Sequence, residues 1–288
     1  MIKAALQHDA LLADIAAARG ERECFHLWWF GQSGFLVHWQ GYFALLDPYL
    51  SDSLTRKYAA TDKPHVRMTR LVIAPERLGF VDVVTSSHNH TDHLDAETLR
   101  ALAGANPELM MVCPEANRTP VRERSGLPDA RILGLDAAGT AGSVPSSTEV
   151  GPFRFEAVPA AHESLDTDVA GRHIYLGFVV RFGPWSLYHS GDTVRFPAMA
   201  EGLRPAKVDV ALLPINGRAP ERRVAGNLSG PEAAQLAHDI GARCVIPCHH
   251  EMFEFNTTPP DAFEAGCVRL GQPFRTLRAG ERWTSPAR

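Results

Sequence analysis

Three histidines and an aspartate fall within six residues of the sequence, at His88, His90, Asp92 and His93. They follow an apolar run at 81–85. Neutral imidazoles and carboxylates are the side chains that bind borderline divalent metals. Because α/β proteins place ligands at the carboxyl ends of strands, we interpret this stretch as a metal site. A solvated loop is the alternative interpretation.

The spacing divides these four side chains between two ions. His88 and His90 can face one ion, while Asp92 and His93 project from the following turn toward a second. We therefore expect two divalent ions roughly 3.5–4 Å apart. Two ions need more than four ligands, so further side chains must reach this point from elsewhere in the chain.

Three later positions offer such side chains, each at the end of an apolar strand. His162 follows one strand, Asp192 lies in a Ser-Gly-Asp-Thr turn after another, and either His249 or His250 ends a third. A single histidine is often structural, but the shared placement at strand ends favours all three as ligands.

Bulk composition limits the class of protein. The chain has 288 residues, 45% of them hydrophobic, and no linker-like segment, which favours a single domain over 1–288. A net charge of −4 argues against nucleic acid as the main partner. The five cysteines are scattered and form no C-x-x-C pair, which indicates a reducing compartment and not a disulfide framework.

The first twenty residues are apolar at helical intervals and are interrupted by His8, Asp9 and Asp14. A secretory signal needs an unbroken apolar stretch, so we expect a leading amphipathic helix at about 1–20 that ends at Gly20. No apolar run approaches the length of a membrane span. We therefore expect a cytoplasmic protein without a membrane partner.

The order of patterns along the chain predicts the fold. Strands with tight glycine turns at 25–47 indicate an antiparallel meander, and strand–helix alternation follows from residue 81. The segments 51–70 and 136–150 are predicted as loops. The hairpin at 34–47 is similar to the one at 177–190. This repetition predicts an α/β fold, an αββα sandwich of two mixed sheets face to face with helices outside.

The ordered motifs resemble those of the metallo-β-lactamase superfamily over nearly the whole chain. They are His88-x-His90-x-Asp92-His93, then His162, then Asp192 in its Ser-Gly-Asp-Thr turn, then His249 after Val245-Ile246-Pro247-Cys248, with Asp47-Pro48 as the early acidic motif. The segments at 28–34, 187–192 and 245–250 are similar to those of the ascorbate-6-phosphate lactonase-like branch.

The resemblance implies a role for each site residue. His88, His90 and His162 would hold the first ion, Asp92, His93 and His249 the second, and Asp192 would bridge them. His249 matches the family position better than His250, and strand alternation would turn its neighbour away. Asp47 and His189 are expected to orient ligand imidazoles through the far ring nitrogen.

Hydrolysis is the expected reaction. A metal-bridging hydroxide would attack an ester or phosphodiester, with Asp92 and Asp192 as the catalytic carboxylates. The substrate is expected to be a phosphorylated or anionic small molecule with a lactone as its reactive group. Arg218 is the expected binding residue, and a solvated basic loop is the alternative interpretation of its segment. A phosphodiesterase acting on cyclic nucleotides or lipid-type diesters is the alternative.

The ligand types suit zinc or manganese, and iron is also compatible with them. The segment between the early Asp-Pro and the histidine cluster is shorter than in the lactonases, which puts the ascorbate phosphate substrate itself in question. The oligomeric state is open. Trp28, Trp29 and Trp39 would line a homo-oligomer interface if exposed, and the core otherwise.

Overall fold

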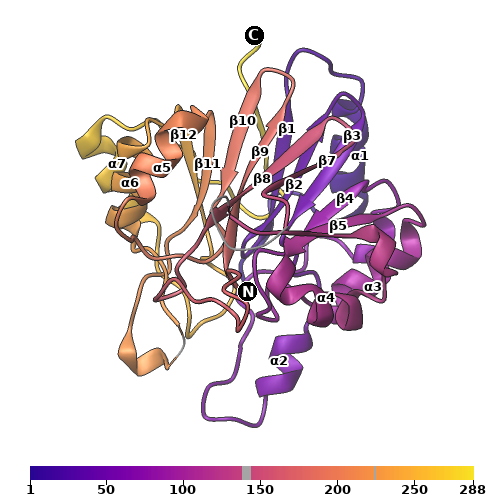
Figure 1. The fold of residues 1–288 in the computed structure, drawn as a ribbon, viewed down its shortest axis with the longest axis horizontal. Helices are drawn as coiled ribbons and strands as arrows, with labels where there is room; N and C mark the ends of the chain where they lie inside the picture. The colour runs from indigo at the N-terminus through magenta and orange to yellow at the C-terminus, as the bar shows by residue number, and fades with distance from the viewer. Residues whose placement is uncertain (138–143, 224) are drawn as a thin grey trace.

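The computed structural model describes residues 1–137, 144–223 and 225–288. Two mixed β-sheets pack face to face, and helices cover both outer sides (Figure 1). The predicted αββα sandwich is therefore confirmed.

Each sheet combines antiparallel and parallel strands. The first has the order β13 (Arg282–Thr284), β1 (His26–Gly31), β2 (Gly34–Trp39), β3 (Tyr42–Leu46), β4 (Val83–Thr85), β5 (Met110–Pro114) and β6 (Ile132–Leu135). The second has the order β12 (Cys244–Cys248), β11 (Val210–Pro214), β10 (Trp185–His189), β9 (Leu176–Phe182), β8 (Phe153–Pro159) and β7 (Ser147–Val150).

The helices divide between the two outer faces, and one stands apart from them. They are α1 (His8–Ala18), α2 (Ser53–Tyr58), α3 (Ala96–Ala105), α4 (Arg118–Ser125), α5 (Met199–Leu203), α6 (Gly230–Asp239) and α7 (Asp261–Leu270). In Figure 1, α1, α3 and α4 lie beside the first sheet, and α5, α6 and α7 lie beside the second. Helix α2 projects from one end of the sandwich.

Alternation of side chains along the strands separates the core into layers. On β1, Leu27 and Trp29 point into the core between the sheets, whereas Trp28 and Phe30 pack with the helices outside. A third apolar cluster joins the second sheet to α6 and α7. Because successive strand residues face opposite sides, both faces of β1 must be apolar, which explains its unbroken hydrophobic sequence.

Strand polarity brings the predicted site residues to one edge of the sandwich. β1 and β3 are each antiparallel to β2, and β3 is parallel to β4, so β1, β3 and β4 end at the same edge. By the same reasoning β8, β10, β11 and β12 run in the same direction, so their carboxyl ends lie at one edge of the second sheet. In each half an antiparallel hairpin leads into a parallel strand, as the internal repetition suggested.

The structure corrects four local predictions. The leading helix is His8–Ala18 and not 1–20. Helix α2 forms within the segment 51–70, and β7 forms within 136–150, both predicted as loops. Residues 138–143 of the second segment lie outside the described residues. The closing strands expected over 274–285 reduce to β13 and an isolated bridge at Phe274.

Burial decides whether the tryptophans lie in the core or at an interface. Trp28, Trp29 and Trp39 are at most 5% exposed, so core packing accounts for them. All five cysteines are free, and Cys113, Cys248 and Cys267 are buried. Within the described ranges, no helix combines the length and apolar character that crossing a membrane requires.

Candidate metal centre

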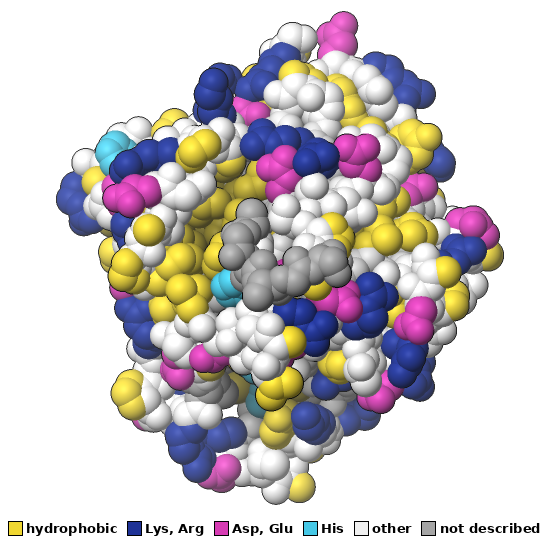
Figure 2. All heavy atoms as spheres, viewed as in Figure 1, with side chains coloured by type: hydrophobic (Ala, Val, Ile, Leu, Met, Phe, Trp, Pro, Cys, Tyr) yellow, Lys and Arg dark blue, Asp and Glu magenta, His cyan; other side chains and the backbone are white. Residues whose placement is uncertain are grey.

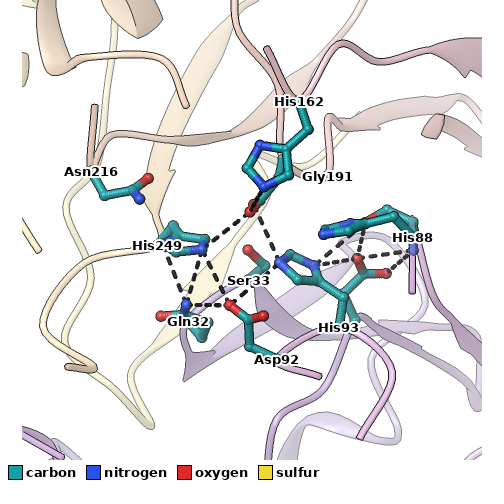
Figure 3. A network of polar contacts seen from close by, with 12 residues as sticks. Gln32, Ser33, His88, Asp92, His93, His162, Gly191, Asn216 and His249 are labelled. Carbon is teal, nitrogen blue, oxygen red and sulfur yellow. Dashed lines mark hydrogen bonds and ion pairs between the residues drawn. The ribbon is translucent and has the colours of Figure 1, made fainter. Parts of the chain in front are cut away.

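The seven predicted ligands come from four strand ends at one edge of the sandwich. The histidine cluster follows β4, and Asp95 at its end caps α3 by accepting from the Thr98 backbone N–H. His162 follows β8, Asp192 follows β10 and His249 follows β12. The polar side chains of the four strand ends therefore converge, and Figure 3 shows His88, Asp92, His93, His162 and His249 among them.

The ligand atoms form three overlapping groups, each with all atoms within 4.8 Å of one another. The groups are His88, His90 and His162; Asp92, His93 and His249; and His88, His93 and Asp192. The first two are the two ligand sets that the sequence predicted. The structure thus brings all seven residues together.

Asp192 lies between the two sets. Its Oδ2 atom is 3.5 Å from Nε2 of His162 and 3.3 Å from Nε2 of His249, and its Oδ1 atom is 3.3 Å from Nε2 of His93. Ligand atoms that share one ion at roughly 2.0–2.2 Å stand roughly 3.0–3.5 Å apart. The spacing around Asp192 is therefore the spacing that a cation on either side of it requires.

Several of these atoms are buried without a hydrogen-bond partner. Among the described residues, Nε2 of His88, Nε2 of His93 and Oδ1 of Asp192 are in this state. A buried polar atom without a partner costs free energy, and an ion is one of the usual reasons for it. The donor set of imidazoles and carboxylates, with its free atoms turned inward, fits divalent metal ions.

Hydrogen bonds at the far ring nitrogens hold the imidazoles in place. Nδ1 of His93 lies 2.8 Å from Oδ2 of Asp47, and Nδ1 of His162 lies 2.9 Å from the Gly226 carbonyl. Nδ1 of His88 lies 3.0 Å from the Ser87 hydroxyl. Each contact leaves Nε2 facing the centre, as metal-binding histidines require. Asp47 thus lies beside the far ring nitrogen of His93, as predicted.

The charges of the centre are strongly coupled. Burial alone would raise the pKa of the Asp192 carboxyl, but His249 and His93 beside it hold that pKa well below its usual range. Burial would lower the pKa of His249, but Asp192 and Asp92 raise it to about 9. The buried carboxylates therefore stay ionised and attract positive charge, whether as protons or as metal ions.

The two adjacent histidines after β12 differ in environment. His249 has φ +57° and turns Nε2 to within 3.4 Å of Oδ2 of Asp92. His250 stacks on Trp29 with ring centroids 4.5 Å apart, and burial lowers its pKa to about 4. The structure places His249, and not His250, among the candidate ligands.

Two predicted residues do not reach the positions expected of them. Nε2 of His189 lies 3.0 Å from the Ser33 carbonyl, and among the described residues His189 has no hydrogen bond to a ligand imidazole. Arg218 is held by the Glu232 carboxylate and by the Asn227 carbonyl at 3.2 Å, outside the cavity over the centre. The Glu232 carboxylate also accepts a hydrogen bond from the Ser229 N–H at the start of α6. The guanidinium of Arg218 therefore contacts the first turn of that helix.

A cavity of 460 Å³ opens over the centre, and its wall contains residues that the sequence did not single out. They are Leu54, Lys57, Tyr58, His65, Asn89, Thr91, Arg124, Ala225 and Phe253, beside His90, Asp92, His162 and Asp192. Lys57 and Tyr58 belong to α2, which therefore covers the site. The cavity is therefore lined by aromatic rings and by the side chains of Lys57 and Arg124, and not by Arg218.

Two further missed residues touch the centre itself. Nε2 of Gln32, in the turn between β1 and β2, lies 2.7 Å from Oδ2 of Asp92. Tyr175 packs its ring against His88, His90 and His162, with centroids 5.3, 6.2 and 5.6 Å away. Strand polarity was the available signal for Gln32, because its turn must share an edge with the end of β4.

Comparison with known proteins agrees with this geometry. The beta-lactamase superfamily domain matches residues 44–250. A UPF0173 metal-dependent hydrolase of Opitutus terrae is 30% identical over 266 residues, which cover 88% of this chain and 97% of the relative. Another, of Pyrobaculum neutrophilum, is 28% identical over 82% of this chain and 89% of its own.

Among solved structures, the isothiocyanate hydrolase from Delia radicum gut bacteria superposes with a TM-score of 0.72. It is 16% identical and covers 91% of this chain and 100% of its own, a likeness of fold. The family match and the 30% identical relative go further, since they span most of the sequence. The chain belongs to the metallo-β-lactamase superfamily and, within it, to the UPF0173 family of metal-dependent hydrolases.

Proposed function

We propose that the protein is a dinuclear hydrolase, with lactonase-like activity on small anionic molecules. The observation that carries the proposal is the position of Asp192 between two complete ligand sets, one with His162 and one with His249. A single ion would leave one of these sets, with its buried inward-facing nitrogens, without a cation.

Divalent ions at these positions would polarise a water molecule and the bond under attack, which is the chemistry of metal-assisted hydrolysis. The chain's own carboxylates have distinct tasks beside them. Asp192 is 3% exposed and lies between the sets. Asp92 also lines the cavity, and His93 and His249 keep its pKa low despite burial, so its carboxylate can orient a water by accepting a hydrogen bond.

The cavity supports a small substrate with negative charge. Its volume of 460 Å³ lies within the range of small-molecule pockets. Lys57 and Arg124 line it, and Arg124 is fixed by donating to the Asn89 carbonyl at 2.6 Å. Among the described residues that line the cavity, the carboxylates are those of Asp92 and Asp192, whose charge the ions would neutralise. A phosphorylated or carboxylated lactone suits this combination.

The other wall of the cavity is aromatic. Tyr58 stacks on His65 with centroids 4.2 Å apart, and Phe253 meets the His65 ring edge-on at 5.1 Å. On the face shown in Figure 2, Lys and Arg side chains are interspersed with Asp and Glu side chains. This distribution supports a small molecule, and not nucleic acid, as the partner. Phosphodiesters remain the second candidate, because Lys57 and Arg124 suit their charge equally well.

The test is a hydrolysis panel on protein reconstituted with zinc or manganese, comparing charged lactones, neutral lactones and phosphodiesters. We expect Asp192→Asn to abolish turnover, and Lys57→Met with Arg124→Met to raise KM for charged lactones while leaving KM for neutral lactones unchanged. Arg218→Met is the matched control, because that guanidinium contacts Glu232 away from the cavity. Phosphodiester cleavage without lactone opening would establish the second candidate, and full activity of Asp192→Asn would refute the metal mechanism.

A further inference from the structure

Gln32 occupies the turn between β1 and β2 and projects its side chain into the second ligand set. Its backbone carbonyl accepts from the His249 N–H and from the Trp29 indole, both at 2.9 Å, so the turn is anchored to the end of β12. The side chain is 1% exposed and lies between Asp92 and His249 (Figure 3).

The amide of Gln32 keeps the spacing of a ligand. Its Nε2 atom is 2.7 Å from Oδ2 of Asp92 and 3.0 Å from Nε2 of His249. The same two partner atoms are 3.4 Å apart from each other. Donor atoms that share one ion have separations of this size, so the outer amide atom of Gln32 stands where a further ligand of that ion would stand.

The orientation of this amide conflicts with a metal at His249. A neutral amide nitrogen has no lone pair for a cation, and its hydrogen would compete for the Nε2 lone pair of His249 that an ion needs. Its Oε1 atom, meanwhile, is buried without a hydrogen-bond partner among the described residues. Side-chain amide oxygen and nitrogen exchange places by a half-turn about the last bond, so their order is an assignment.

A cation removes both difficulties at once. With the amide turned, Oε1 of Gln32 would face Oδ2 of Asp92, and two oxygens at this distance repel each other unless a positive ion lies between them. Neutral carbonyl oxygens are ordinary ligands of divalent cations. The orphaned oxygen then gains a partner, and the lone pair of His249 becomes free for the ion.

We propose that Oε1 of Gln32 is a protein ligand of the ion held by Asp92, His93 and His249, an assignment that rests on the proposed two-metal centre. Gln32 adds a hard oxygen to a set that already holds Asp92, whereas the set of His88, His90 and His162 contains only imidazoles. Oxygen ligands suit manganese and imidazoles suit zinc. The two positions therefore differ in metal preference, with the Gln32 position favouring manganese.

Equilibrium dialysis of the metal-free protein against Mn²⁺ or Zn²⁺, with elemental analysis, tests this assignment. We expect Gln32→Ala to bind the first ion as wild type does and the second at least about tenfold more weakly, the lower end of losses at supporting positions. Gln32→Glu should retain the second ion, because its carboxylate offers an oxygen at the same reach. Gln40→Ala is the control, since Gln40 is exposed and has the same φ of +49° in the neighbouring hairpin turn.

The variants separate a ligand from a residue that only orients Asp92 by hydrogen bonding. If Gln32 acted as a donor to Asp92, Gln32→Glu would repel that carboxylate and weaken the second ion as much as Gln32→Ala, which would overturn the assignment. Unchanged binding in Gln32→Ala would overturn it as well. A wild-type protein that binds one ion would instead refute the two-metal centre, and the assignment with it.

Discussion

Asp47 gives the sharpest prediction about how the fold supports the centre. Its carboxylate is fully buried and accepts from Thr85 Oγ1 at 2.7 Å, from the Ser87 N–H and hydroxyl, and from His93 Nδ1 at 2.8 Å. Asp47→Asn keeps the size of the side chain. It removes the charge and points an amide N–H₂ at groups that are themselves donors.

Two losses follow from this substitution. The imidazole of His93 loses the carboxylate that fixes its tautomer, and replacement of such a partner costs roughly 10–100-fold in metal affinity, or about 1.4–2.7 kcal/mol. At least one buried donor also loses its charged acceptor, which lowers the free energy of unfolding of the metal-free protein by about 2–3 kcal/mol. Burial would raise the pKa of Asp47, but His93 keeps that pKa below its usual range. At neutral pH the substitution therefore replaces an ionised carboxylate.

Asp136→Asn is the matched control. Asp136 is 1% exposed and lies 2.9 Å from Nδ1 of His173, the same kind of pair outside the ligand sets. Denaturant unfolding and metal titration of both variants separate the effects. Both should lose stability, and only Asp47→Asn should lose metal affinity. Equal metal affinities in Asp47→Asn and wild type would refute the role assigned to Asp47.

Two further predictions concern protons. Asp192 and Asp92 raise the pKa of His249 to about 9 in the metal-free protein, so a metal ion must displace a proton below that pH. Competition with a chelator should therefore show the metal affinity falling by up to about tenfold per pH unit as the pH is lowered. Metal binding that does not depend on pH would contradict this. Burial lowers the pKa of His38 to about 4, below its unfolded value near 6.5, so its contribution to stability is present above pH 6.5 and is lost toward pH 4. His38→Gln, which can still accept from the Gly41 N–H, should therefore gain stability relative to wild type as pH falls between those values, and denaturation curves with a constant difference would rule this out.

Much of the centre follows from the sequence because its ligands obey one rule. His88, His162, Asp192 and His249 each follow an apolar strand, and strands of common direction end at a common edge. Asp47 obeys the same rule on β3. An apolar strand and the polar residue that ends it are local features, so they can be identified without knowing which distant residues meet.

The predictions that failed depend on tertiary contacts and on local structure without a clear sequence pattern. Arg218 looked free because its partner Glu232 lies fourteen positions further on, across a turn and into a helix. His189 ends β10, but its Nε2 atom contacts the Ser33 carbonyl, a backbone group whose position no sequence pattern indicates. Helix α2, which brings Lys57 and Tyr58 over the cavity, is a short helix in a polar segment without clear periodicity.

The number of ions bound by the chain tests the central claim most directly. Elemental analysis of wild type, His162→Ala and His249→Ala after equilibrium dialysis would count them. The geometry around Asp192 predicts two ions in wild type and one in each variant, because each substitution disrupts a different ligand set. A single ion in wild type, retained in either variant, would contradict the two-metal centre.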